Sequence, residues 1–401
     1  MLFSIHLPAQ ITPGCTDPVA SNYNPLANQN DGSCLYAAAT VSSLASWQLD
    51  QALTEISGLI HDGGRLLGQQ DEIDTRLFEL DTLNGNIVQT YSCSGVSNYN
   101  WEEIAQDSQY IYIGDFGNNI NGNRTDLRIY RVDKSSLNNG NTVVDTIGFS
   151  YSDQVNFAPT GINNTDFDCE AFVVTNDSIF LFTKRWISGG TTLYGLPKTP
   201  GQHLAMPIDS FNSQGYITGA TQLHGTQLVM LCGYNNFLQP FLYLLYDYPN
   251  NAFFKGNRRR LGINLPFHQI EGIATRNGLK VYLANEAFSS SFTSVAQQLH
   301  TIDLTMFLNH FLNPVTTGQP EYDSNLPALY PNPTNQSITL CNADNFRGKR
   351  YLIRDCMGRV VSHGIFTGTI DVSTFGQGVY LLQLEDMPTK RFTIERLVPI
   401  Q

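Results

Sequence analysis

Residues 100–115, NWEEIAQDSQYIYIGD, and residues 269–286, QIEGIATRNGLKVYLANE, share one order of features: a glutamate, a small apolar run, a polar turn and an aromatic-rich apolar run. Three more copies of this order begin at Glu55, Cys169 and Ile217, and the copies lie about 45 to 70 residues apart. Each copy is followed by a third apolar run. Such a repeat is typical of a β-propeller, which has one four-stranded sheet per repeat around a channel. We therefore expect an all-β fold with a five-bladed β-propeller over residues 40–317.

The ends of this ring are expected to pair with each other. The stretch ASWQLDQAL, residues 45–53, precedes the first copy, whereas no outermost strand remains after the last copy. We expect this stretch to complete the last blade, because closure of the ring removes free sheet edges. A six-bladed ring is the alternative. It would need a degenerate repeat in the long interval between the second and third copies.

The composition favours strands and limits the partners. The chain has 33 Gly, 19 Tyr and 23 Phe, and only 14% of its residues are charged. Aromatic residues favour strands, and glycines are common in turns. The net charge of −12 argues against nucleic acid or an anionic membrane as a partner, since both attract a basic face. No stretch reaches the roughly 20 apolar residues of a membrane-spanning helix, so we expect no membrane span.

The N-terminal residues indicate a signal remnant and a disulfide-bonded segment. Residues 1–10, MLFSIHLPAQ, have the short apolar run of the end of a secretory signal. Residues 11–36 are too rich in Asn, Asp, Pro and Gly to build an apolar core, and a Cys15–Cys34 disulfide is expected to hold them. GCTDP, NYNP and DGSC in this segment resemble a cysteine-bounded repeat of Bacteroidota surface proteins. This segment also has side-chain oxygens that could bind a calcium ion, or could only shape tight turns. They belong to Asp17, Asn22, Asn24 and Asp31.

The other cysteines divide by position. Cys341 and Cys356 lie close together in the C-terminal segment and could form a second bridge. Buried free thiols are expected at Cys93, Cys169 and Cys232.

The C-terminal residues predict a separate small domain. A polar linker at 318–326 is followed by short apolar runs bounded by turn residues, which predict a β-sandwich over 327–401. YPNP at 330–333, a D-x-x-G-x-x-V element and a D-V-S…G-x-Y element follow in order. Together they closely resemble the C-terminal sorting domain of the type IX secretion system. The resemblance implies a Bacteroidota protein, exported through the periplasm to the surface or the medium, with the secretion machinery as the partner of residues 327–401.

A column of oxygen-bearing side chains stands at the start of the first strand of each copy. Aligned copies place there Ser57, Glu102, Glu170, Thr218 and Glu271. First strands line the channel of a propeller, so these side chains should converge on its axis. Three carboxylates in a poorly solvated space repel one another unless a cation or protons neutralise them. Calcium accepts six to eight oxygens in loose geometry and fits better than magnesium. The alternative is that each glutamate turns away to backbone amides of the neighbouring blade.

The order Ser, Glu, Glu, Thr, Glu resembles the calcium-activated nucleotidases, or soluble apyrases. The firmest pieces are NWEEIAQDSQYIYIGDFGNN, from Asn100, and FLFTKRW, from Phe180. The resemblance covers the propeller only and implies five blades with calcium in the central tunnel. The family's acidic D-D-R-T-G turn has at best FELDTLNG as a counterpart, and its long catalytic-face insertions are missing or altered. The resemblance therefore implies the calcium ring more strongly than the catalysis.

A second set of polar residues follows the second strands. The start of strand one and the end of strand two lie at the same mouth of a propeller channel, and such mouths are usual ligand sites. Lys184 and Arg185 would offer concentrated positive charge there, suited to a phosphate or carboxylate. Trp101, Trp186 and Phe288 could face a base or sugar, or pack between blades. The ligand-binding residues expected at this mouth are Asp115, Asn118, Lys184, Arg185, Tyr234, Asn285 and Glu286, in a column that also contains Gln69 and Gly233.

Two function classes remain. The first is a secreted or surface-displayed binding module in which calcium is structural and the mouth binds a glycan, a peptide or a small molecule. The second is a calcium-dependent hydrolase of phosphate esters, in which the metal polarises a phosphoryl group with Lys184 and Arg185. The sequence has no nucleophile-elbow, zinc-protease or P-loop motif. Since no base or nucleophile can be named, we favour binding, and whether the protein is an enzyme stays open.

Overall fold

The computed structural model describes residues 11–139, 142–314, 329–340, 343–355, 358–385 and 390–394. These residues fall into two compact units that divide between Pro314 and Val315. The expected signal remnant at 1–10, the linker at 318–326, and both Cys341 and Cys356 lie outside the described residues. Strands dominate both units, and α1 (Thr305–Leu312) is the one α-helix in the described part of the chain. The all-β prediction is confirmed.

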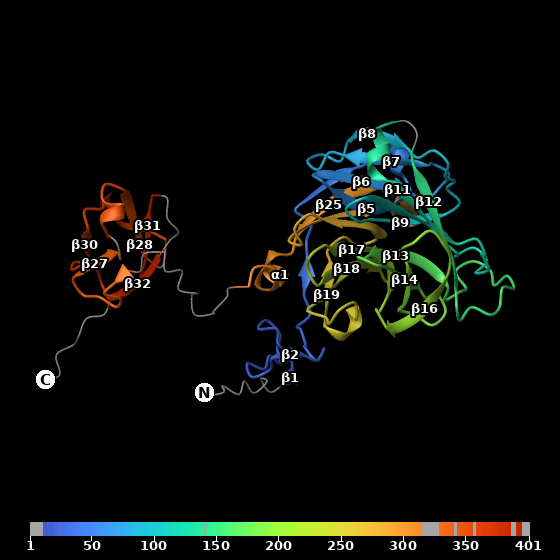
Figure 1. The fold of residues 1–401 in the computed structure, drawn as a ribbon. Helices are drawn as coiled ribbons and strands as arrows, with labels where there is room; N and C mark the ends of the chain where they lie inside the picture. Colours follow the sequence, from blue (N-terminus) through green and yellow to red (C-terminus); the bar gives the residue numbers. More distant parts are fainter. Residues whose placement is uncertain are drawn as a thin grey trace, which may run out of the picture. The chain divides into compact units, whose positions relative to one another are not determined.

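Four-stranded antiparallel units follow one another along the first part of the chain (Figure 1). The first has β5 (Ile56–Asp62), β6 (Arg65–Gln70), β7 (Arg76–Leu80) and β8 (Ile87–Ser92). The second has β9 (Trp101–Gln106), β10 (Tyr110–Asp115), β11 (Arg128–Asp133) and β12 (Val144–Tyr151). The third has β13 (Asp168–Val174), β14 (Ser178–Lys184), β15 (Thr191–Pro197) and β16 (Gly201–Phe211). Parallel pairing of β12 with β16 joins the second and third units into one eight-stranded sheet.

The next two units use strands from both ends of this part of the chain. The fourth has β17 (Tyr216–Leu223), β18 (Leu228–Tyr234), β19 (Pro240–Tyr246) and β20 (Asn257–Ile263), with β3 (Thr40–Val41) added in parallel to β20. The fifth has β21 (Ile270–Thr275), β22 (Lys280–Asn285), β25 (Gln298–Asp303) and β4 (Ala45–Gln48). Antiparallel pairing of β4 with β25 confirms the expected closing strand. Two short strand pairs and three 3₁₀ turns complete the unit. The pairs are β1 (Pro13–Gly14) with β2 (Gln29–Asn30), in parallel, and β23 (Phe288–Ser289) with β24 (Ser294–Val295), antiparallel. The turns are η1 (Gln51–Leu53), η2 (Lys134–Asn139) and η3 (Phe253–Lys255).

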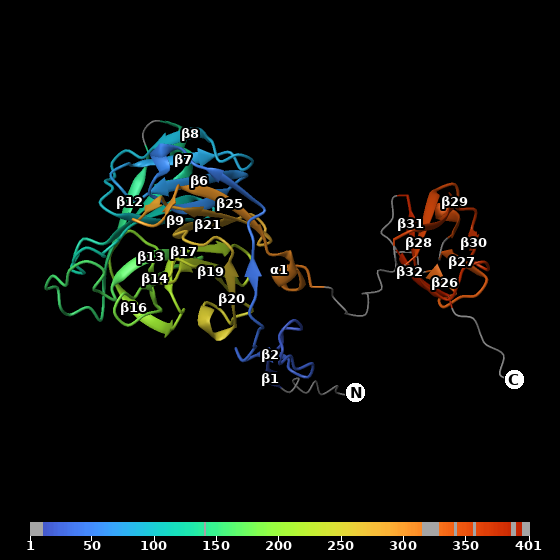
Figure 2. The ribbon, with the colours of Figure 1, turned by 180° about the vertical axis from the view of Figure 1, so that it is seen from behind.

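The first strands of the units form a closed circuit. β5 contacts β9, β9 contacts β13, β13 contacts β17, β17 contacts β21, and β21 contacts β5 again. We call these strands the inner ring. Figure 2 shows them at the centre of the unit, with the later strands of each sheet farther out. Side chains from every sheet can therefore meet inside the inner ring.

Apolar clusters between neighbouring sheets hold the units together. Tyr112 and Ile129 of the second unit, for example, share a cluster with Ile179 of the third. Four similar clusters lie between the other neighbours, the last between the fifth unit and the first. Because both faces of each sheet are covered, a strand such as β18 is buried along its whole length. Each fully buried large aliphatic side chain contributes about 1.5–3 kcal/mol.

Turn chemistry fixes the tight hairpin of the first unit. Asp62 pairs with Arg65, which leaves Gly63 and Gly64 as a two-residue loop. Both have positive φ, +55° and +98°. A two-residue hairpin loop of this kind needs left-handed backbone at both positions, which glycine adopts without strain.

The N-terminal segment is fastened to the first unit. The Cys15–Cys34 disulfide is present, as predicted. Asp17 is buried, and its carboxylate accepts hydrogen bonds from the hydroxyls of Tyr36 (2.6 Å) and Tyr246 (2.5 Å). His310 Nε2 of α1 lies 2.9 Å from its other oxygen.

The possible calcium ligands of this segment are used by the chain itself. Asn22 Oδ1 accepts from the backbone of Leu35, and Asn24 and Asp31 accept from amides two residues on. The oxygens of Asn24 and Asp31 therefore shape tight turns, and that of Asn22 joins the two ends of the segment.

The second unit consists of two antiparallel sheets that share one apolar cluster. One sheet has β26 (Leu329–Tyr330), β27 (Ser337–Leu340) and β30 (Thr369–Asp371). The other has β28 (Arg350–Asp355), β29 (Val360–Ile365), β31 (Gly378–Leu384) and β32 (Lys390–Ile394), and η4 (Ala343–Phe346) connects β27 to β28. In the described part of both units, no helix is long and apolar enough to cross a membrane.

Candidate functional site

A β-bulge in every strand of the inner ring positions the predicted column. In β5 the pairing passes from Ile56 to Gly58, so Ser57 is left out of the ladder. The same one-residue shift occurs in the other four first strands. The residues skipped are Ser57, Glu102, Glu170, Thr218 and Glu271. A bulge leaves its extra residue unpaired and redirects its side chain. The five aligned positions are thus structurally equivalent.

The three glutamates of the column converge. Glu102, Glu170 and Glu271 are buried, and each offers a carboxylate oxygen within 4.8 Å of the other two. The hydroxyls behave differently: Ser57 Oγ donates to the carbonyl of Glu102, and Thr218 Oγ1 donates to that of Ile270 at 2.5 Å. Each hydroxyl oxygen keeps lone pairs that can face a ligand.

Burial makes ionisation of these glutamates costly. It is the largest cause raising the pKa of Glu102 well above the usual range, and the charge of Glu170 adds to it. Burial likewise raises the pKa of Glu271 to about 7, although Lys184 opposes it. The pKa of Glu170 is also raised by burial, and Lys184 works in the opposite direction. Without a metal ion, burial therefore favours the protonated form of these carboxyls more than water does, and the pKa of Glu271 lies near neutral pH.

Lys184 points into this cluster. Its Nζ lies 3.2 Å from Glu170 Oε2 and 4.6 Å from the centre of the Trp186 ring, and the side chain is only 4% exposed. The charge of Lys184 therefore pairs with Glu170, as expected for a lysine buried among carboxylates, and its part in ligand binding stays a prediction. Arg185 Nε donates instead to Ser188 at 2.6 Å, within its own turn.

Three other expected ligand residues support loops. Asp115 is fully buried and forms ion pairs with Arg124 (3.0 Å) and Arg128 (3.2 Å). Asn118 Oδ1 accepts from the backbone of Arg124, and Asn285 Oδ1 lies 2.8 Å from His300 Nε2. These contacts give the three side chains structural roles, and their expected part in ligand binding stays a prediction.

The second column was misaligned because the hairpins between the first and second strands differ in length. Counted from the bulge, the residue equivalent to Lys184 lies one place after Asp115, Gly233 and Asn285 and two places after Gln69. The equivalent residues are Asp71, Phe116, Lys184, Tyr234 and Glu286. Tyr234 and Glu286 thus belong at this mouth, and Gln269 Nε2 joins them, at 3.2 Å and 2.5 Å respectively.

Further carboxyls, which the sequence analysis missed, surround the glutamates. Asp168, opposite Lys184 in the ladder, accepts from Trp186 Nε1 at 2.7 Å and shares a hydrogen bond with Glu170. Burial and the charge of Glu55 raise the pKa of Asp71 to about 7, and Asp71 Oδ1 is buried without a hydrogen-bond partner. The acidic cluster comprises Glu55, Asp71, Glu102, Asp168, Glu170, Glu271 and Glu286. Lys184 is the basic residue that lies among these carboxyls. Asp71 and Asp168 could have been predicted from the sequence by counting residues from the bulge in each copy.

One more carboxyl lies across the inner ring. Glu103, the residue after the bulge in β9, is fully buried. Its Oε1 accepts from the amide of Ile104 (2.9 Å), and its Oε2 accepts from the amide of Ala220 in β17 (2.7 Å). The equivalent residues in the other strands are small: Gly58, Ala171, Gly219 and Gly272. A Cβ at Gly58 would lie 2.7 Å from Glu103 Oε1, so the small residues make room for this side chain.

Comparison with known proteins assigns the C-terminal unit. Residues 328–398 match the family model of the secretion system C-terminal sorting domain. This segment is a type IX sorting domain. The protein is therefore of the type exported by Bacteroidota through the periplasm, to the cell surface or the medium, and the type IX machinery is its partner. A search of curated proteins found no match to the chain.

Solved structures give weaker likenesses. PorZ, a surface component of the type IX secretion system of Porphyromonas gingivalis, is 14% identical with a TM-score of 0.30. The match covers 85% of this chain and 45% of PorZ, so the chain spans less than half of that protein. U3-55K is 10% identical with a TM-score of 0.38, over 65% of this chain and 99% of its own. The WD40 repeats of RRP9 are 8% identical with a TM-score of 0.37, over 66% and 100%.

Proposed function

We propose that residues 40–317 form a five-bladed β-propeller that holds calcium on its axis and binds an extracellular ligand at the acidic mouth. The blade count rests on five four-stranded units, five apolar clusters between them and a closed inner ring. A sixth blade has no strands to form it among residues 11–139 and 142–314. In this proposal residues 327–401 fold as a small β-sandwich and serve as the sorting signal for export.

The observation that carries the calcium proposal is the buried glutamate triad on equivalent bulges. Carboxylate oxygens are the ligands that calcium prefers, and its loose geometry suits side chains delivered from separate strands. A divalent ion and the ammonium of Lys184 would together neutralise Glu102, Glu170 and Glu271. Asp71 Oδ1, buried and without a partner, offers a further oxygen. When bound, the ion would supply a fixed positive charge to which oxygens of a ligand can coordinate.

The charge at this mouth narrows the ligand. Seven carboxyls and one paired lysine would repel a free anion and favour a polyol or a cationic group. A glycan, through hydroxyls on the ion, or a basic peptide fits this charge best. Trp186 and Tyr216, whose ring centres are 4.6 Å apart, add flat apolar surface beside the mouth.

The second candidate function is calcium-dependent hydrolysis of phosphate esters. It is favoured by the triad, which resembles part of the Ser/Glu series of the calcium-activated nucleotidases. It is weakened by Lys184, whose charge pairs with Glu170, and by Arg185, which bonds Ser188. Both functions require the calcium ion, but only the second includes hydrolysis of the bound molecule.

The test is thermal unfolding with and without calcium. Calcium at about a hundred times its Kd should stabilise the native state by about 2.7 kcal/mol. Glu271→Gln should remove most of this gain, whereas Asp177→Asn, an exposed acid in the β13–β14 turn, should keep it. A melting temperature that changes with neither calcium nor chelator would overturn the proposal. Calcium-dependent phosphate release from nucleoside diphosphates would replace the binding module by the hydrolase.

A further inference from the structure

A second cavity lies at the other end of the inner ring. Its volume is about 530 Å³, within the roughly 300–1,000 Å³ of small-molecule sites. All five strands of the inner ring contribute residues from their C-terminal ends, among them Ile60, Ala105, Val174, Thr221 and Thr275. The bulges stand near the beginnings of the same strands, so the cavity and the acidic cluster occupy opposite ends, with Glu103 between them.

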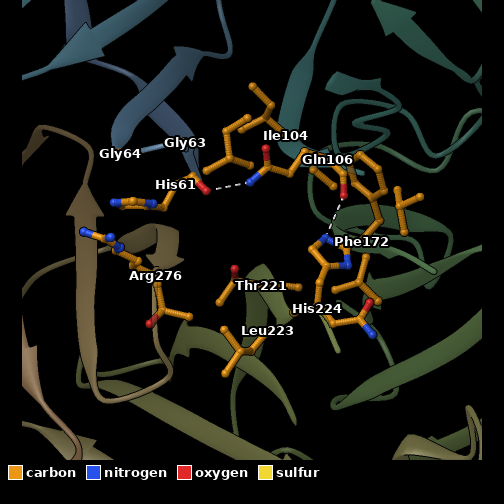
Figure 3. A pocket seen from close by; sticks show the side chains of 17 residues that line it. His61, Gly63, Gly64, Ile104, Gln106, Phe172, Thr221, Leu223, His224 and Arg276 are labelled. Atoms are coloured by element: carbon orange, nitrogen blue, oxygen red, sulfur yellow. Dashed lines mark hydrogen bonds between the residues drawn. The ribbon is translucent and has the colours of Figure 1, made fainter. Parts of the chain in front are cut away.

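The charge of this cavity is opposite to that of the acidic cluster. None of its 17 lining residues is Asp or Glu, although the chain carries a net charge of −12. Its ionisable residues are His61, His224 and Arg276. Arg276 is exposed and has no ion-pair partner among the described residues. Figure 3 shows its guanidinium beside the His61 ring, and its charge adds to burial in lowering the pKa of that histidine.

The rest of the wall offers hydrogen bonds and apolar surface. Gln222 Oε1 is buried without a hydrogen-bond partner, which is costly unless a donor reaches it. Thr221 lies between Arg276 and His224 (Figure 3). Leu223, a half-buried residue of the wall, adds apolar surface.

Hydrogen bonds fix the rim. Gln106 Nε2 donates to the carbonyl of His61 at 2.7 Å, and His224 Nε2 lies 3.0 Å from the carbonyl of Gln106. Lys134 Nζ donates to Gln106 Oε1 at 2.7 Å and holds the glutamine in place. The rim is therefore preorganised, while Arg276 and the half-buried Thr221 keep polar atoms for a ligand.

We propose that this cavity binds a small organic carboxylate that also carries a hydrogen-bond donor, such as a hydroxy acid or an amino acid. The guanidinium of Arg276 is suited to bidentate contact with the carboxylate. The half-buried Thr221 hydroxyl accepts from the ligand's hydroxyl or ammonium group, and the carbon body rests on the half-buried Leu223. Binding is independent of calcium, because Glu103 separates the two ends of the ring.

The test is calorimetric titration of the full chain with lactate, galacturonate, alanine, acetate and inorganic phosphate, in chelator and in calcium. At least one of the first three should bind with a Kd below about 10 mM, more tightly than acetate or phosphate and equally in both conditions. Binding by galacturonate or lactate alone identifies the donor as a hydroxyl, and binding by alanine alone identifies an ammonium.

Variants locate the site. Arg276→Gln should weaken binding at least tenfold, and Thr221→Val should reduce the preference over acetate. Lys255→Gln is the matched control, because it removes a positive charge that pairs with Asp209 on the outer surface and should leave affinity unchanged. The proposal is overturned if none of the three acids binds, if phosphate binds more tightly, or if Arg276→Gln binds like the unmodified chain. Melting temperatures within about 1 °C show that each variant is folded.

Discussion

Glu103 should be among the most important polar side chains for the stability of the first unit. Its two oxygens accept from the amides of Ile104 and Ala220, at 2.9 Å and 2.7 Å, inside the ring. Glu103→Ala leaves both buried N–H groups without a partner. Each unsatisfied buried group costs about 1–3 kcal/mol, so the expected loss is about 2–6 kcal/mol. Glu103→Gln keeps one acceptor oxygen and turns an NH₂ group toward the other amide, so about half of that loss is expected.

The assay is urea unfolding followed by tryptophan fluorescence. All three tryptophans, Trp47, Trp101 and Trp186, lie in the first unit, so the signal reports that unit alone. The midpoint should fall in the order unmodified chain, Glu103→Gln, Glu103→Ala, with an unchanged slope. Glu72→Ala, at an exposed residue of the β6–β7 turn, is the control and should change stability by less than about 0.5 kcal/mol. If Glu103→Ala unfolds at the same midpoint as the control, the side chain does not bridge β9 and β17 as described.

Three further predictions concern pH, the N-terminal segment and export. Burial raises the pKa of Glu271 and Asp71 to about 7, above their unfolded values, so in chelator stability should fall from pH 4.5 to 7.5 by up to about 1.4 kcal/mol per pH unit for each carboxyl. Calcium should flatten or reverse that slope, and a chelated protein that is more stable at pH 7.5 would contradict the cluster's electrostatics. Burial alone would raise the pKa of Asp17, but hydrogen bonds from His310, Tyr246 and Tyr36 outweigh burial and lower it. Asp17→Asn should therefore raise hydrogen exchange in residues 11–36 at neutral pH. Unchanged exchange would mean that the disulfide alone holds these residues. After deletion of residues 329–401 the protein should stay in the periplasm. Normal surface display of the shortened protein would contradict the assignment of this segment as a sorting domain.

The repeat made much of the fold predictable from the sequence. Glu102 and Glu271 stand at the same place in two nearly identical phrases, and a periodic pattern carries strand order and facing directly. The closing strand at Ala45–Gln48 was predictable because the last repeat lacks an outer strand. The sorting domain was predictable because its short elements occur in a fixed order.

The mouth was less predictable because it depends on backbone irregularity and pairing. The hairpins between first and second strands differ in length, so alignment by strand pattern placed Asp115 and Asn285 at the mouth, where Phe116 and Glu286 stand. The inward turn of Lys184 follows from the carboxylates around it, which no single repeat reveals. The same holds for Glu103, whose partners are backbone amides, and for the second cavity, whose residues come from all five repeats.

The central claim is a calcium ion held by three bulged glutamates. Calorimetric titration of the chelator-treated chain with calcium tests it most directly. The account predicts one ion per chain in the unmodified protein and in Asp177→Asn. It predicts no binding at that site when Glu102, Glu170 and Glu271 are all changed to Gln, while the neutral triad stays folded in chelator because mutual repulsion has been removed. One ion bound equally well by the triple variant, or none by the unmodified chain, would contradict the account.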